Sequence, residues 1–187
     1  MRPASEQSTP HVPRTAVRGL QVAVLVLALV VCAVPAASAR NKATLDSFEN
    51  AVFQKLNQTR VDHGLTPLRL STRLTTASNA HSVEMADDGY FDHSSRDGTP
   101  FWKRVDQWYG SSGYRFWSVG ENLLWASPSL TPDRAIAMWM ASPEHRANIL
   151  NAQWREIGIA AVHLTNAPGV YRGLPVTVIT TDFGARH

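Results

Sequence analysis

The helix-forming and strand-forming patterns of this 187-residue chain are separated along its length, and that separation most constrains its fold. Apolar residues recur at helical spacing within 45–63 and again within 71–89. The stretches rich in β-branched residues come late, at 157–164 and 176–183, with Pro and Gly between them. Helices first and strands late, without strand–helix alternation, predict an α+β fold.

Shorter helices are expected in the middle of the chain. Phe101, Val105 and Trp108 share one face of a short helix. The segment 131–133 reads Thr-Pro-Asp, in which threonine can cap a helix, proline fits its first turn and aspartate complements its dipole. Ser-Pro-Glu repeats this start signal at the beginning of 142–150. Two further helices are therefore predicted before the strands begin.

The N-terminal segment has the pattern of a secretory signal. Arg14 and Arg18 precede an apolar run at 20–34, and small residues follow at 37–39. The run falls short of the roughly 20 residues that span a bilayer comfortably. We expect residues 1–39 to be a signal peptide and the protein to be secreted to the extracellular space, with no stable membrane span in the mature chain. A retained N-terminal anchor is the alternative.

Cleavage after Ala39 would leave a loose lead-in at 40–46 and one domain at 47–187. The single cysteine, Cys32, would be removed, so packing alone must hold the domain. Of the 18 basic and 15 acidic residues, three basic residues and one acidic residue belong to the removed segment. The nearly balanced remainder predicts no nucleic-acid partner.

Five short motifs occur in the order in which bacterial CAP domains carry them. They are 56–60 with 64–68, 80–93, 120–123, 139–150 with Ile157-Gly158, and 181–184. Together these motifs span nearly all of residues 45–184. The chain thus resembles the CAP superfamily, which includes cysteine-rich secretory proteins, antigen 5, pathogenesis-related proteins and SCP-like extracellular proteins.

The resemblance implies an α-β-α sandwich with a central antiparallel sheet. Sequence patterning supports only two strands, so a further strand is expected around 117–125, where alternation is poor. The resemblance also implies a cleft lined by two histidines and acidic groups, and the matching residues are His93, Glu121 and His145. Relatives outside bacteria usually place a second acid where this chain has Ser142.

The missing acid leaves the chemistry open. Glu144 and Asp182 are substitutes that no motif assigns. His93, Glu121 and His145 are the candidate ligand-binding residues, and any catalytic residues are expected among them. The first hypothesis is binding of a small hydrophobic or cell-envelope ligand, such as a lipid or cell-wall component, because the resemblance includes members that bind sterols and fatty acids.

The alternative is a peptidase-like hydrolase assisted by a divalent metal. His93 and His145 would be ligands of Zn²⁺ or another divalent cation, with an open position for water. The chain has no His-Glu-x-x-His, Cys-x-x-Cys or Gly-x-Ser-x-Gly motif, so no metal or nucleophile motif favours catalysis. A third hypothesis is an envelope role through a surface that spares the cleft. Whether the protein is an enzyme, and its oligomeric state, stay open.

Each polar residue also has a structural interpretation. Glu121 can pin its own loop by accepting backbone N–H bonds, and His93 and His145 can be ordinary surface residues. His81 shares an apolar helix face, which favours a core histidine bonded to a neighbour over a ligand. Asp182 is better explained as a group that fixes the last strand than as a catalytic acid.

Overall fold

The computed structural model describes residues 44–187, so the predicted signal at 1–39 and most of the lead-in lie outside the described residues. The elements are α1 (Ser47–Asp62), β1 (Arg69–Leu70), α2 (Thr72–Asp88), α3 (Phe101–Asp106), β2 (Trp117–Ala126), α4 (Pro132–Ala141), α5 (Pro143–Ile149), β3 (Glu156–Ala167), a 3-10 turn (Gly169–Tyr171) and β4 (Leu174–Arg186). Within 44–187, none of the helices combines the length and apolarity needed to cross a membrane.

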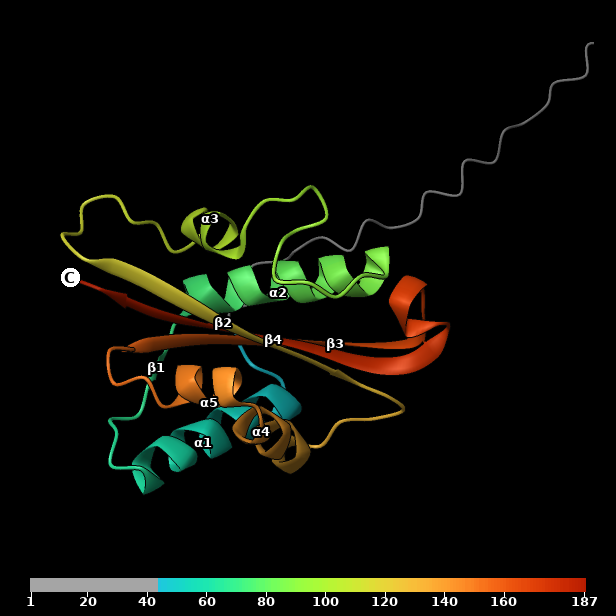
Figure 1. Cartoon of the computed structure of the whole chain (residues 1–187), viewed down its shortest axis with the longest axis horizontal. Coiled ribbons are helices and arrows are strands. Elements are labelled where there is room, and N and C mark those ends of the chain that lie inside the picture. The colour runs from blue at the N-terminus through green and yellow to red at the C-terminus, as the bar shows by residue number, and fades with distance from the viewer. Residues whose placement is uncertain (1–43) are drawn as a thin grey trace, which may run out of the picture. The chain divides into compact units, whose positions relative to one another are not determined.

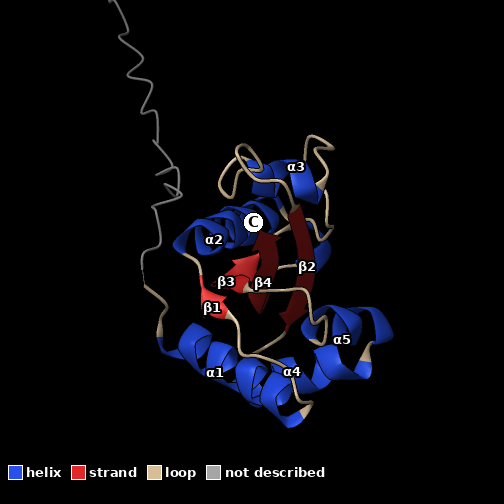
Figure 2. Cartoon of the chain, turned by 90° about the vertical axis from the view of Figure 1, so that its left-hand side faces the viewer, coloured by secondary structure: helices blue, strands red, loops and turns tan. Residues whose placement is uncertain are grey.

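The strands form one sheet in the order β1-β3-β4-β2. Helices α2 and α3 lie on one face of the sheet, and α1, α4 and α5 lie on the other (Figure 1, Figure 2). The α+β sandwich is therefore confirmed. The sheet is mixed rather than purely antiparallel, because β1 pairs in parallel with the start of β3, Arg69 opposite Glu156. Two residues are too short a segment to show any strand periodicity in the sequence.

Capping residues in the sequence mark where helices α2 and α4 begin and where α2 ends. The Ser71 hydroxyl accepts from the Leu74 N–H at the start of α2, and Gly89 ends that helix in the left-handed conformation. Thr131 caps α4, and proline occupies its first turn. These caps fix where the connecting loops leave each helix.

The strand expected around 117–125 is β2, which pairs along its full length with β4. Its weak alternation has a physical cause, since helices cover both faces of the sheet and two polar residues are buried at its centre. The register places Glu121 opposite Asp182 and Asn122 opposite Thr181. As the strand at the end of the sheet order, β2 leaves one edge unpaired by any described strand.

Helix α2 packs unusually close to the sheet at one position. A Cβ on Gly158 would lie 2.0 Å from the backbone carbon of Leu74, so only glycine fits there. The largest of the three apolar clusters among the described residues lies on the α1 and α4 side. It includes Val52, Leu56, Trp139, Ile149, Ile157, Ile159, Ile179 and Phe183. The sheet is thus held between two different helical layers.

Candidate functional site

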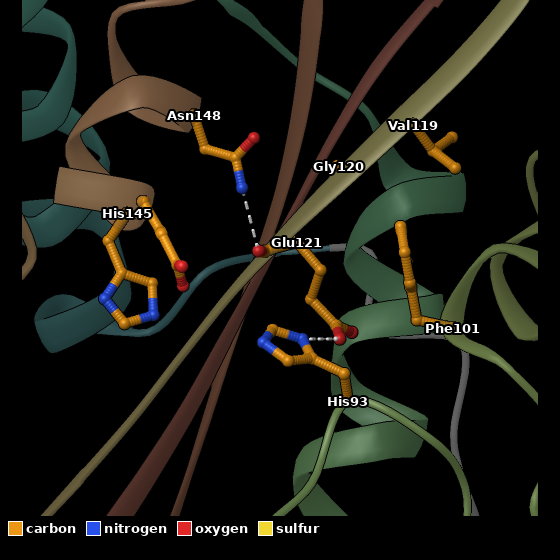
Figure 3. Close-up of a pocket in the computed structure, with 8 residues that line it drawn as sticks. His93, Phe101, Val119, Gly120, Glu121, His145 and Asn148 are labelled. Carbon is orange, nitrogen blue, oxygen red and sulfur yellow. Dashed lines mark hydrogen bonds and ion pairs between the residues drawn. The ribbon is translucent and has the colours of Figure 1, made fainter. Parts of the chain in front are cut away.

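A cleft of about 410 Å³ lies over the β2 edge of the sheet (Figure 3). Its lining residues are His93, Phe101, Val119, Gly120, Glu121, Glu144, His145 and Asn148. The three residues selected from the sequence all line it. His93 reaches it from the loop after α2, and His145 reaches it from α5 on the other side of β2.

Glu121 lies beneath the cleft with a side chain only 1% exposed. Its Oε1 is 2.8 Å from His93 Nδ1, and its Oε2 accepts from Arg104 Nη2. Arg104 also donates from Nη1 to the backbone carbonyl of His93, at 2.9 Å. An ionised carboxylate only accepts hydrogen bonds, so His93 Nδ1 carries the proton and donates the hydrogen bond to Glu121 Oε1. The free Nε2 of His93 is then the nitrogen available to a ligand.

The two imidazoles have opposite electrostatic surroundings. The hydrogen bond to Glu121 raises the pKa of His93 above its ordinary value. Burial lowers the pKa of His145, and the positive charge of His93 lowers it further. His93 is therefore the imidazole that holds a proton more readily, while His145 favours the neutral form.

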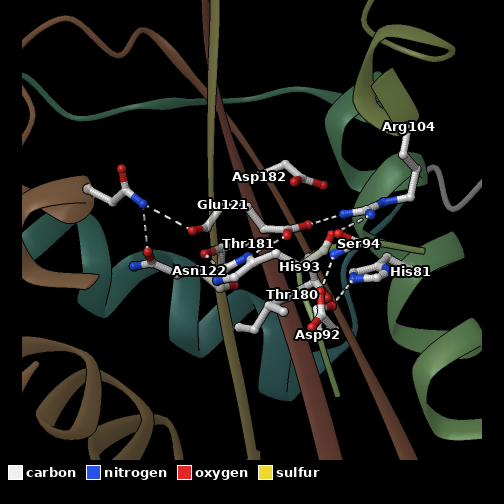
Figure 4. Close-up of polar contacts among 12 residues, drawn as sticks. His81, Asp92, His93, Ser94, Arg104, Glu121, Asn122, Thr180, Thr181 and Asp182 are labelled. Carbon is white, nitrogen blue, oxygen red and sulfur yellow. Dashed lines mark hydrogen bonds and ion pairs between the residues drawn. The ribbon is translucent and has the colours of Figure 1, made fainter. Parts of the chain in front are cut away.

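Behind Glu121 lies a second carboxyl group, that of Asp182 (Figure 4). Asp182 is fully buried, and the Ser78 hydroxyl donates to its Oδ2 at 2.7 Å. Burial raises the pKa of Asp182 well above its usual range, and the negative charge of Glu121 adds to the effect. Asp182 does not line the cleft. Of the two substitutes for the missing acid, only Glu144 borders the cleft.

His81 is a core histidine, as its position on an apolar helix face predicts. It is fully buried, and its Nε2 bonds the carbonyl of Asp92 at 2.9 Å. Burial lowers its pKa. By holding the residue before His93, His81 fixes the loop from which His93 enters the cleft.

Asn148 ties α5 to the edge strand. Its Nδ2 donates to the side-chain oxygen of Asn122 at 3.0 Å, and Asn122 in turn donates to the His145 carbonyl at 3.0 Å. A Cβ on Gly120 would meet the Trp154 ring at 2.8 Å and the Asn148 side-chain oxygen at 3.0 Å. Glycine at this position lets α5 approach β2, and the approach places His145 at the cleft.

The side chains present do not complete a metal site. Among residues 44–187, no three His, Cys, Asp or Glu side chains gather as a metal-binding group. Protein donors already engage both oxygens of Glu121. Glu144 does not gather with the two imidazoles into such a group, so His93 and His145 are the ligands left to consider. A carboxylate behind a histidine is common around bound metals, but zinc usually takes at least three protein ligands. The described side chains of the cleft therefore supply too few ligands for a zinc site.

Arg104 is the important site residue that sequence inspection did not select. It lies on the same helical stripe as Phe101, Val105 and Trp108, at positions that should face the interior. An arginine on a buried stripe needs acceptors for its hydrogen bonds, and a carboxylate is the partner that also compensates its charge. That signal was available in the sequence, although it does not name Glu121 as the partner.

Comparison with known proteins agrees with the fold and the motif order. Residues 53–178 match the model of the cysteine-rich secretory protein family, CAP. The chain belongs to the CAP family. Its cleft residues His93, Glu121 and His145 all fall within the matched region. This confirms the superfamily that the five motifs indicated.

Three relatives show how far the likeness extends. YkwD of Bacillus subtilis (strain 168), described as an uncharacterized protein, is 34% identical over 120 residues, which cover 64% of this chain and 44% of YkwD. An outer surface protein from Borrelia burgdorferi matches with a TM-score of 0.62 at 17% identity, over 76% of this chain and 97% of that protein. An extracellular protein containing a SCP domain from Bacillus anthracis matches with a TM-score of 0.55 at 26% identity, over 72% and 39%.

The chain spans less than half the length of the curated relatives it matches. At 17% identity, the likeness to the Borrelia outer surface protein shows the fold alone. What the CAP domain does in this chain must therefore be argued from its own cleft.

Proposed function

We propose that this CAP protein is exported and binds a small hydrophobic or cell-envelope ligand in the cleft between His93 and His145. The observation that carries the proposal is the buried Arg104–Glu121 pair beneath the cleft, which orients the His93 imidazole toward it. No Ser, Thr or Cys occurs among the described residues that line the cleft, so its lining offers no hydroxyl or thiol nucleophile. An oriented imidazole without such a nucleophile favours binding over acyl-transfer chemistry.

The lining favours an amphiphilic ligand. Phe101 and Val119 give the cleft an apolar wall, while the imidazoles and Asn148 supply hydrogen-bonding groups. The raised pKa of His93 favours an imidazolium that can meet a carboxylate or another anionic head group. A long-chain fatty acid and a soluble peptidoglycan fragment are the two probes that fit this description.

Export is the second part of the proposal. The basic residues, apolar run and small residues within 1–39 support it, as does the similarity to an extracellular protein of Bacillus anthracis. Protein recovered from the culture medium should begin at Arg40 when its N-terminus is sequenced by mass spectrometry. An intact N-terminus on protein that stays with the cells would contradict this part.

Binding is tested by calorimetric titration of the secreted protein with each probe. Saturable binding of at least one probe is expected. His93→Ala and His145→Ala should each weaken it about tenfold, equivalent to roughly 1.4 kcal/mol. His63→Ala is the matched control, because His63 lies exposed at the end of α1 and does not line the cleft. Absence of saturable binding to either probe rejects the proposed function.

Metal-assisted hydrolysis is the second candidate, supported by the carboxylate behind His93. It requires a ligand set that the described side chains do not complete. Elemental analysis of the secreted protein decides: stoichiometric zinc that is lost in His145→Ala would favour the hydrolase over simple binding. Metal-free protein without peptidase activity would remove this candidate.

A further inference from the structure

A second pocket, of about 300 Å³, lies between α2 and α3 and shares no lining residue with the cleft. We call it the α2–α3 pocket. Its lining residues are Ala80 and Glu84 from α2, Ser95, Asp97 and Thr99 from the following loop, and Arg104, Gln107 and Trp108 from α3 and the turn after it. Its volume is at the lower end of the range for small-molecule sites.

Internal hydrogen bonds hold the loop that forms one wall of this pocket. The Ser95 N–H donates to the Thr99 carbonyl at 2.9 Å, and the Thr99 N–H donates to the Asp97 carboxylate at 2.8 Å. The Arg96 N–H donates to Glu84 at 2.9 Å, which anchors the loop to α2. The wall is thus formed before any ligand arrives, so little ordering is needed on binding.

The opposite wall contains a buried donor without an acceptor. Arg104 is 5% exposed, and its two terminal nitrogens bond Glu121 and the His93 carbonyl. Its Nε–H is buried and has no hydrogen-bond partner among residues 44–187. A buried donor left without an acceptor costs about 1–3 kcal/mol. Arg104 lines the pocket, so the residue with this unpaired donor borders it.

The chemistry of the lining selects the ligand class. Glu84 and Asp97 accept hydrogen bonds, Arg104 and the amide of Gln107 donate, and serine and threonine hydroxyls do both. The carboxylates disfavour an anion, and the guanidinium disfavours a cation. Trp108 adds an apolar ring surface. A neutral ligand with several hydroxyls and one apolar face matches the hydrogen-bonding groups, the mixed charges and the Trp108 ring of this lining.

We propose that the α2–α3 pocket binds a neutral sugar ring, stacked on Trp108 and hydrogen-bonded to the loop carboxylates and Gln107. This site is separate from the cleft and does not depend on the function proposed for it. Arg104 is the residue they have in common, since it lines the pocket and bonds Glu121 beneath the cleft.

The test is a titration of the secreted, ¹⁵N-labelled protein with chitotetraose and with maltotetraose. It is followed through the indole N–H signal of Trp108 in the wild type and through the backbone amide signals of the 95–99 loop in every variant. At least one tetrasaccharide should shift these signals saturably. Trp108→Leu and Asp97→Ala should weaken binding about tenfold, roughly 1.4 kcal/mol. Trp102→Leu is the matched control, because Trp102 lies on α3, 46% exposed and outside the pocket.

Three outcomes would overturn the proposal. The first is no shift at millimolar saccharide, and the second is equal weakening in Trp108→Leu and Trp102→Leu. The third is saturable binding of choline in place of either tetrasaccharide, which would identify a cation site. If Trp108→Leu does not fold, the exposed Asp97 still provides the decisive variant. Binding that Asp97→Ala leaves unchanged then rejects the site.

Discussion

The two faces of the sheet both bury an arginine, but they satisfy it differently. On the α1 side, Arg60 donates only to backbone carbonyls, those of Thr66, Ile149 and Asn151. On the α2 side, Arg104 donates to the carboxylate of Glu121, which in turn contacts His93. An arginine bonded to backbone fixes loops, whereas an arginine bonded to a carboxylate also fixes a charge.

The rest of each face follows the same division. The α1 side is filled mainly by large apolar side chains, with Trp139 fully buried among them. The α2 side holds a group of buried polar residues that includes Ser78, His81, Ser82, Arg104, Glu121, Thr180 and Asp182. Such a network costs desolvation unless every member is paired. The comparison indicates that the α1 face supplies most of the apolar stability. The α2 face supplies the buried charge beneath the cleft, and α5, on the α1 face, brings His145 to it.

The largest expected effect lies on the apolar face. Trp139→Ala removes a fully buried side chain whose indole N–H donates to the Leu123 carbonyl at 3.1 Å. The free energy of unfolding should fall by about 4 kcal/mol in denaturant titrations. Met138→Ala, a neighbouring exposed position, should change it by less than about 0.5 kcal/mol. Similar losses in both variants would break the assignment of stability to this face.

Arg104→Met comes next, because it leaves the buried Glu121 carboxylate without its cation. The expected loss is about 3 kcal/mol. Adding Glu121→Gln should recover part of it, since the second change removes the uncompensated charge. Lys103→Met, on the exposed side of the same helix, serves as control. If the loss of unfolding free energy in the double variant equals the sum of the two single losses, the two residues do not interact.

A smaller, pH-dependent effect is expected at Asp182. Its pKa is raised in the folded protein by burial and by Glu121, so the stability it contributes is fully present below its unfolded pKa. That contribution is lost as pH rises toward the folded pKa. Relative to wild type, Asp182→Asn should therefore become more stable as pH rises from about 4 to neutral. Unfolding curves with the same pH slope for both proteins would contradict a raised pKa.

The smallest effect is a difference between the two imidazoles. In NMR titrations without ligand, His93 should titrate at higher pH than His145, because Glu121 raises the pKa of His93 while burial lowers that of His145. Glu121→Gln should lower the pKa of His93. Replacing His93 by alanine should raise the pKa of His145, since a positive neighbour is removed. The reverse order of titration would contradict the proposed geometry.

Much of the fold follows from local sequence signals. The capped starts of α2 and α4 and the late β-branched strands were predictable because each depends on neighbouring residues. The two-residue strand β1 was not, since only its contact with β3 makes it a strand. The strand β2 could be placed only through the family resemblance, because its buried polar residues break the alternation.

The site shows the same limit. Motif order selected His93, Glu121 and His145, and the structure brings all three to one cleft. The motif order could not reveal that Arg104 and His93 engage both carboxylate oxygens of Glu121. That contact depends on how α3 packs against β2. Since protein donors engage both of its oxygens, the role of Glu121 as a ligand-binding residue stays a prediction.

The most direct test is a titration of the purified protein with a long-chain fatty acid, observed at the imidazole resonances of His93 and His145. If the cleft is the binding site, both resonances should move along one saturable curve, and that of the exposed His63 should stay in place. Saturable binding that leaves both cleft imidazoles unchanged would contradict the account.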